Sequence, residues 1–352
     1  MTEEAELSAL PRHPARSAGF SLIEILVGVG IGMIGILVIM QVFLLSEGQR
    51  RTTSTGGDAQ TTGAIALYTL ERDIRQGGYG LASLGLLGCT VTLPNGAAVA
   101  AAPAAINPAG IPAGDANTDV IAVFYGNANA AIEGDFIVQQ PAAATYTVRT
   151  PSNFTSGDFV IAAPAPRPNP CNLTLAQIVA PPGASTVTVN TGQAGAANGT
   201  LYDLGQQPRV LVYAVRGGSL TVCDFTQNDC TGGAGDSTIW SPVAEGVVSL
   251  RAEYGRDTSG PPMDGIADLY DQTTPTTACG WVRASALRIA LVARSGQYDK
   301  NDVTAAAPAW AGSATTPIDL SGNGDWQHYR YKTFQTVVPL RNIAWMGVQS
   351  GC

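Results

Sequence analysis

The pattern of hydrophobic and polar positions divides the chain into one long apolar run near its start and many short apolar stretches after it. Residues 25–45 form a run of 21 residues without a charge. As a helix, such a run is about 30 Å long and crosses the hydrocarbon core of a membrane. A cleaved secretory signal is the alternative, but its apolar region is usually about 7 to 15 residues long and ends in a small-residue cleavage site. The run continues instead into QVFLLSEGQRR (41–51), which favours a retained anchor.

The polar segment that follows, residues 46–76, has the spacing of a second helical half. Its apolar residues recur at helical intervals: Ala64, Leu67, Leu70 and Ile74. Glu71 and Arg75 form an i,i+4 pair of opposite charge. The stretch TTSTGGDAQTTG (52–63) is a weak helix former. The helix therefore either continues because the head packs on it or breaks near Gly56 and Gly57, and the Gly-Gly pair after residue 76 predicts its end.

Beyond this helix, short β-branched or alternating runs are bounded by turn residues, which is typical of strands. The runs are DVIAVFYG, ATYTVRT, DFVIAA, STVTVN and RVLVYAVRGGSLTVCDF. The last run contains Gly217 and Gly218, which predict a two-residue hairpin. Residues 94–118 are rich in Ala, Gly and Pro and indicate loop rather than core. APAPRPNP (163–170) predicts an extended surface loop.

Six cysteines all lie on the C-terminal side of the apolar run, and therefore on one side of any membrane. They are Cys89, Cys171, Cys223, Cys230, Cys279 and Cys352. An even number without CxxC spacing favours three disulfides in an oxidising compartment over reduced thiols or a zinc site. Only Cys223 and Cys230, which close the segment CDFTQNDC, are near enough in sequence to be paired with each other.

These elements predict an α+β fold. We expect a long N-terminal helix, membrane-embedded in its first half, packed on an antiparallel, β-rich, disulfide-stapled head. The net charge of −8, with no cluster of Lys and Arg, argues against bulk nucleic-acid binding, so we expect no direct nucleic-acid partner. A local basic patch near Arg330, Lys332 and Arg341 stays open.

The stretch GFSLIE (19–24) places an acid at the start of the apolar run. Arg12, His13 and Arg16 precede it, and positive residues stay cytoplasmic, so the chain after the run is expected outside the inner membrane. A lone carboxylate near the bilayer centre costs about 3 kcal/mol on translocon scales and usually marks a partner or a functional path. Glu24 therefore either snorkels to the interface or meets a cation nearby.

GFSLIE followed by about twenty apolar residues resembles the class III signal of type IV prepilins. The resemblance implies cleavage by prepilin peptidase between Gly19 and Phe20 and N-methylation of Phe20. The new positive amine of one subunit would pair with Glu24 of a neighbour, because a carboxylate and an ammonium that lose their water together cost less than either alone. Gly28 and Gly32 have the GxxxG spacing of packed helices, or are merely tolerated membrane glycines.

The segment LERDIRQGGYG (70–80) resembles the end of the first helix in the PilW family of minor pilins. Further resemblances are PVAEGVVSLRAEYG, DGIADLYD, ALRIALVARS and TFQTVVPLRN, in that order. They imply a leader (1–19), a transmembrane half (20–45) and an exported half (46–76) of one helix, and a β-rich head (77–352).

The PilW resemblance also implies a function: a non-enzymatic subunit that helps initiate and cap a type IV pilus. Its partners would be prepilin peptidase, the inner membrane, other minor pilins, the major pilin and a tip adhesin. The head would be periplasmic before assembly and at the cell surface afterwards. The nearest rival is a GspJ-like pseudopilin of type II secretion. A second rival is a bitopic envelope protein whose head binds or hydrolyses a ligand, and which would retain residues 1–19.

Enzyme chemistry has little support in the head. The chain has two histidines, and His13 would leave with the leader, so His328 is alone. Its surroundings, DWQHYRY (325–331), lack a nucleophile-elbow pattern, which predicts a surface or edge-strand histidine. The sequence contains no phosphate loop and no HExxH.

The acidic stretch DTSGPPMDGIADLYD (257–271) resembles half of a calcium loop. Its candidate ligands are Asp257, Asp264, Asp268 and Asp271, with Gly265 at the bend. Gly260 and Pro262 fall where earlier ligands belong. The stretch therefore predicts either a Ca²⁺ site or an acidic turn that caps a strand, and no other cofactor is expected.

Overall fold

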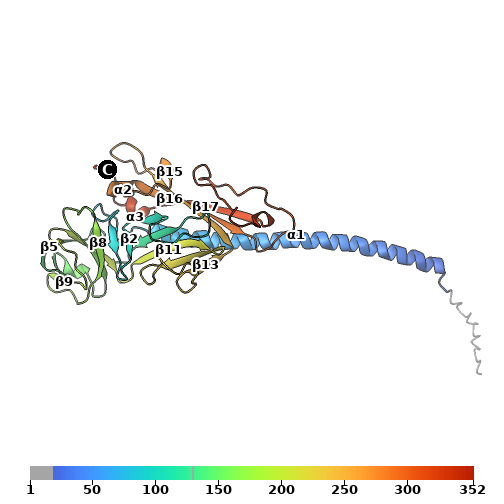
Figure 1. The fold of residues 1–352 in the computed structure, drawn as a ribbon, viewed down its shortest axis with the longest axis horizontal. Coiled ribbons are helices and arrows are strands. Elements are labelled where there is room, and N and C mark those ends of the chain that lie inside the picture. Colours follow the sequence, from blue (N-terminus) through green and yellow to red (C-terminus); the bar gives the residue numbers. More distant parts are fainter. Residues whose placement is uncertain (1–18, 129–130) are drawn as a thin grey trace, which may run out of the picture. The chain divides into compact units, whose positions relative to one another are not determined.

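The computed structural model describes residues 19–128 and 131–352, and for residues 48–55 the backbone alone. The expected leader residues Arg12, His13 and Arg16 lie outside the described residues. The chain divides into two units, residues 1–54 and residues 55–352. The helix α1, Leu22–Gln76, has residues in both units and is drawn in blue in Figure 1. It continues through Gly56 and Gly57, which decides between the two expectations for this segment.

The head consists of three sheets. The eight-stranded sheet has the order β2 (Ala98–Ala100), β1 (Thr90–Thr92), β8 (Asn172–Gln177), β7 (Phe159–Ala163), β10 (Thr200–Gly205), β5 (Asp135–Ala142), β6 (Thr145–Val148), β9 (Thr186–Thr188). The five-stranded sheet has the order β13 (Ser241–Glu245), β12 (Ser219–Asp224), β11 (Arg209–Arg216), β4 (Ile121–Tyr125), β3 (Ala104–Ile106). The four-stranded sheet has the order β15 (Leu269–Asp271), β14 (Val247–Arg256), β16 (Ala284–Arg294), β17 (Tyr331–Pro339).

Short helical segments complete the described chain. They are the α-helices α2 (Ala278–Arg283) and α3 (Arg341–Ala344) and the 3-10 helices η1 (Pro151–Asn153) and η2 (Trp326–His328). Figure 1 shows α2 and α3 in the head, beside the strands of the four-stranded sheet. The head is thus β-rich with little helix outside α1, as predicted.

One strand pairing departs from the expected antiparallel head. Strands β1 and β8 are parallel, with Thr90 opposite Asn172. The residues directly before these two strands, Cys89 and Cys171, form a disulfide. The parallel pairing follows a long connection between the strands, as parallel strands require.

The second half of α1 lies in the main core of the head. Ala66, Leu70 and Ile74 are buried, at most 2% exposed, in one cluster with residues of the five- and four-stranded sheets. The sequence pattern placed Ala64 in this apolar stripe, but Ala64 is exposed and Ala66 takes its place. The small residues Gly63 and Ala66 allow the strands of the head to approach α1 closely. A search for large apolar residues does not detect such positions.

Residues 94–118 were expected to form a loop outside the core, and this expectation is wrong. The segment contains β2 and β3, and residues 101–106 are all buried. Alanine has too little bulk to give a strong strand signal, yet it lets this stretch approach the end of α1. A Cβ atom at Gly77 would lie 2.3 Å from the carbonyl oxygen of Pro103, so the two backbones are in close contact there.

The hairpin expected at Gly217 and Gly218 is confirmed. These residues connect β11 and β12 and both have positive φ, +58° and +71°. A type I′ turn needs positive φ at both central positions, which glycine adopts without steric cost.

Candidate functional site

The residues at the start of α1 are exposed within the chain. Phe20 is 80% exposed and lies before the first residue of α1, Leu22. Glu24 is in the first turn, where its backbone N–H donates to the Ser21 carbonyl at 2.9 Å. An acid in a first turn interacts favourably with the helix dipole. The candidate cleavage site at Gly19 and Phe20 is therefore separated from Glu24 by about one turn of chain.

The first half of α1 is long and apolar enough to cross a membrane. This part, Leu22–Glu47, has a mean hydropathy of 2.7, and none of its most apolar stretch is buried within the chain. No heavy atom outside the helix lies within 4 Å of a Cβ placed at Gly28 or Gly32. The face that carries these two glycines is thus open to another helix in the isolated chain.

The second half of α1 is held on the head by a buried polar contact that sequence reasoning missed. Asp73 is 2% exposed, and its carboxylate accepts a hydrogen bond from the hydroxyl of Tyr213 on β11. The Arg72 guanidinium donates to the same carboxylate at 3.1 Å. Burial, and then the Asp73 carboxylate, raise the pKa of Tyr213 well above its ordinary value. Tyr213 therefore stays protonated and remains a donor to Asp73.

The signal for this contact is present in the sequence. Position 73 follows Ala66 and Leu70 at helical spacing, so the apolar face of α1 includes an acid. A carboxylate on a buried face requires a donor. The sequence does not identify that donor, because Tyr213 is 140 residues away in the chain.

A second polar contact closes the end of α1. The side-chain amide of Asn342, in α3, donates to the carbonyls of Gln76 at 2.9 Å and Gly77 at 3.0 Å. The last carbonyls of a helix have no partner within the helix. Asn342, which is 9% exposed, supplies that partner although it lies 266 residues further along the chain than Gln76.

The aromatic ring of Phe334, on β17, lies close to the backbone of α1 at Gly63. A Cβ atom at Gly63 would lie 2.1 Å from a ring carbon of Phe334. Any larger residue at position 63 would therefore collide with the Phe334 ring unless the ring moved. By contrast, Gly57 has no such neighbour within 4 Å.

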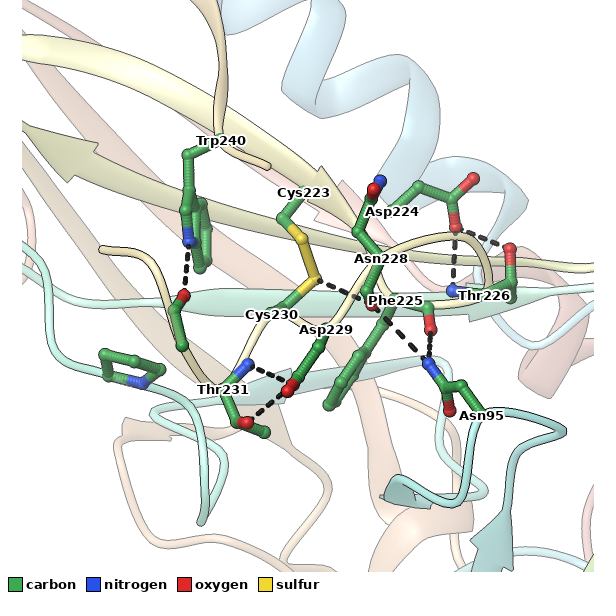
Figure 2. Close-up of a disulfide and its surroundings, with 12 residues drawn as sticks. Asn95, Cys223, Asp224, Phe225, Thr226, Asn228, Asp229, Cys230, Thr231 and Trp240 are labelled. Atoms are coloured by element: carbon green, nitrogen blue, oxygen red, sulfur yellow. Dashed lines mark hydrogen bonds between the residues drawn. A yellow bond between two sulfur atoms is a disulfide. The ribbon is translucent and has the colours of Figure 1, made fainter. Parts of the chain in front are cut away.

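All six cysteines are paired. The disulfides are Cys89–Cys171, Cys223–Cys230 and Cys279–Cys352, the second being the pairing that the sequence favoured. Figure 2 shows the Cys223–Cys230 loop, where the Asn95 amide donates to the carbonyls of Phe225 at 2.9 Å and Asn228 at 3.5 Å. The disulfide loop thereby supports the turn between β1 and β2.

The acidic stretch forms a turn that is largely satisfied by the chain itself. Carboxylate oxygens of Asp257, Asp264 and Asp268 lie within 4.8 Å of one another. Asp271 is not in this group, because it pairs with Arg256. The four expected ligands are therefore not brought together, since the strand β15 carries Asp271 away from the turn.

Asp257, the buried member of the acidic turn, already has several partners. Its carboxylate accepts hydrogen bonds from the N–H groups of Ser259 at 2.9 Å and Gly265 at 2.6 Å. The Arg283 guanidinium lies 3.4 Å away. A cation at this site would have to compete with Arg283, so the donor set fits Ca²⁺ poorly.

Among the described residues, His328 has a tyrosine ring and an aspartate as side-chain neighbours. It lies in η2 and stacks on Tyr298 with ring centroids 4.7 Å apart. Its Nε2 atom is 3.7 Å from Asp302, an exposed residue. Arg330, from the basic patch left open above, pairs with Asp299.

Two family models match parts of the chain. Residues 212–342 match the family "Type IV Pilus-assembly protein W", and residues 14–40 match the prokaryotic N-terminal methylation motif. The first match begins at β11, which carries Tyr213, and ends at Asn342. No curated protein matches the chain. A type IV-like pilin from Thermus thermophilus is similar in structure at 12% identity and a TM-score of 0.31, covering 82% of this chain and 96% of that one.

Proposed function

We propose that the chain is a PilW-like type IV minor pilin, and the two family matches support this proposal. It is a structural rather than a catalytic protein. It is made as a prepilin, anchored in a membrane by the first half of α1, and cut between Gly19 and Phe20. Phe20 is then N-methylated, and the mature chain enters a type IV pilus, where it helps to initiate and cap assembly.

The assembly step depends on Glu24. This carboxylate lies in the first turn of an exposed apolar helix, so in lipid it lacks water and has no cation from the described part of its own chain. Cleavage creates a positive amine at Phe20 of a neighbouring subunit. The pairing of the two charges offsets a cost of about 3 kcal/mol for the acid alone, so each subunit is stable only in register with another.

The head supplies the surface that such a subunit presents. The three disulfides favour an oxidising compartment, which supports a periplasmic head before assembly. We expect contacts with other minor pilins and the major pilin through α1, and with a tip adhesin through the head. Prepilin peptidase is the partner at the cytoplasmic face.

Glu24 in the first turn, four positions after Phe20, is the observation that carries this proposal. The decisive experiment is mass spectrometry of the N-terminus of protein purified from its own cells. We expect a mature chain that begins at N-methylated Phe20, and a chain that begins at Met1 in cells without prepilin peptidase. An uncut chain in cells that contain the peptidase would contradict the proposal.

Cells that lack this protein distinguish pilus assembly from type II secretion. We expect them to make few pili while secreting normally, and to recover when the chain is restored. Normal piliation with defective secretion would instead identify a pseudopilin of the GspJ kind.

A further inference from the structure

An apolar groove lies beside β2. It has a volume of about 760 Å³ and is lined by β2, by residues 105–111, and by side chains that include Phe124, Val210, Phe225 and Trp281. None of its lining residues is ionisable. Ala98, Ala100, Ala109 and Gly110 are exposed as well as lining the groove, so it is reachable from solvent.

The groove follows the outer edge of β2. Ala97 and Val99 face one side of this strand and Ala98 and Ala100 the other, and all four line the groove. A space that touches both faces of a strand lies along its edge. β2 is the outermost strand of the eight-stranded sheet and pairs only with β1.

The hydrogen-bonding groups on this edge have no partner among the described residues. The Leu93 N–H donates to the Ala97 carbonyl at 2.7 Å, and the Ala101 N–H donates to the Cys89 carbonyl at 2.8 Å. In an antiparallel pair, every second residue bonds to the neighbouring strand. These two bonds therefore mean that the N–H and C=O groups of the odd-numbered residues point toward β1. The N–H and C=O groups of Ala98 and Ala100 therefore point away from β1, into the groove.

Other sheet edges carry features that discourage further pairing. β17 contains Lys332 and Pro339, β13 contains Pro242 and Glu245, and β15 contains Asp271. Charged residues and prolines on an edge strand are the usual protection against added strands. β2, with the sequence AVA, has neither.

The two remaining edges are covered by the chain itself. On β9, the outward carbonyls of Thr186 and Thr188 accept hydrogen bonds from Gly183 at 2.8 Å and Val179 at 3.1 Å. On β3, the outward N–H of Ile106 donates to the Tyr254 hydroxyl at 2.6 Å. Among the outer strands of the described chain, β2 alone has no charged residue, no proline and no hydrogen bond from the chain on its outward groups.

We infer that the β2 edge is a docking site for an extended, uncharged segment of a partner polypeptide. The segment adds as a ninth strand of the eight-stranded sheet, its backbone bonds to Ala98 and Ala100, and its apolar side chains enter the groove. Strand addition of this kind takes affinity from backbone hydrogen bonds and specificity from pockets for alternate side chains. A groove without charges favours a segment without charges, because a buried unpaired charge is costly. This contact is in the head and does not depend on Glu24.

The test uses the full chain in detergent micelles and capped peptides about seven residues long that alternate Val and Thr. The control peptide has the same composition with a central Pro, which cannot complete the ladder. We expect the Val/Thr peptides, and not the control peptide, to slow hydrogen exchange at the amides of Ala98 and Ala100.

Two variants of the protein block the edge without touching its bonds to β1. Ala100→Pro removes an outward N–H, and Ala98→Lys adds a charge to the exposed edge. Each should weaken binding about tenfold, whereas Ala98→Ser should bind like the original chain. Melting temperature verifies folding, and if Ala100→Pro does not fold, Ala98→Lys decides. Absence of protection at millimolar peptide would overturn the inference. So would binding by both blocked variants that equals binding by the original chain, or binding that leaves the amides of Ala98 and Ala100 unprotected.

Discussion

The two halves of α1 belong to one helix but are stabilised in different ways. In the first half, Ile25 is 56% exposed and Leu26 63% exposed, and the face with Gly28 and Gly32 has no neighbour within the described chain. In the second half, Leu70 and Ile74 are fully buried in the head. Most helical stability comes from packing of an apolar face. The second half therefore obtains its packing from its own head, whereas the first half has no such packing within the described chain.

The largest expected effect comes from Glu24→Ala, which changes the first half alone. The variant should insert into the membrane at normal levels, because removal of a charge favours insertion. It should not enter pili, because the registering charge is absent. Immunoblots of membrane and sheared pilus fractions measure both quantities, and normal incorporation of Glu24→Ala would exclude the pairing mechanism.

Tyr213→Phe, on β11, removes a contact of the second half of α1 and leaves the first half intact. The substitution removes the donor to the buried Asp73 carboxylate while keeping the ring. Loss of a partner by a buried charged group costs about 1.5 to 3 kcal/mol. We therefore expect the free energy of unfolding to fall by that amount and the melting temperature to fall with it. Insertion in the membrane should be unchanged. As a control, Tyr68→Phe alters an exposed tyrosine of α1. An equal loss of melting temperature in both variants would contradict the role of the Asp73 contact.

Two glycine substitutions in α1 should have opposite signs. Gly63→Ala forces the Phe334 ring to move and should destabilise the head by about 1 to 3 kcal/mol. Gly57→Ala meets no neighbour and should stabilise the helix by about 0.5 to 1 kcal/mol. Thermal unfolding of both variants measures the difference. The same sign for the two would show that helix propensity, and not contact with the head, dominates this segment.

A buried acid on β10 gives a smaller, pH-dependent effect that does not involve α1. Burial raises the pKa of Asp203 to about 6, with the nearby Asp158 charge acting in the same direction. Because the folded pKa lies above the unfolded one, this group favours the folded state at low pH, and that contribution is lost as pH rises from about 4 to about 6.

Asp203→Asn should therefore raise the free energy of unfolding at pH 8 by on the order of 1 kcal/mol, and the melting temperature with it. At pH 4 both should be unchanged. The asparagine can keep the bond that Asp203 accepts from the Gly205 N–H at 2.8 Å. An increase of equal size at both pH values would show that the charge of Asp203 is not the cause.

The smallest expected effect is that of calcium on the acidic turn. Since Asp257 already has Ser259, Gly265 and Arg283 as partners, we expect no change in melting temperature up to millimolar Ca²⁺. Arg283→Gln removes the competing cation and serves as the comparison. A clear rise with Ca²⁺ in the original chain would restore the metal site as a working hypothesis.

Local patterns predict the elements of this protein better than they predict the contacts between them. The apolar run, the second helical half and the hairpin at Gly217 are all local, and the structure contains each of them. The stretch 94–118 was misjudged because alanine-rich strands are stabilised by neighbours rather than by their own propensity. The Asp73–Tyr213 and Asn342–Gln76 contacts join residues far apart in sequence, so a single sequence does not identify the pairs.

The amide of Asn342 also makes the end of α1 depend on a late part of the chain. It completes the end of α1 from a position 266 residues further along the chain. The junction of α1 with the head is therefore complete only when nearly the whole chain is present. A head cut short before α3 would leave the carbonyls of Gln76 and Gly77 without their amide. We expect such a shortened chain to hold the end of α1 less firmly on the head.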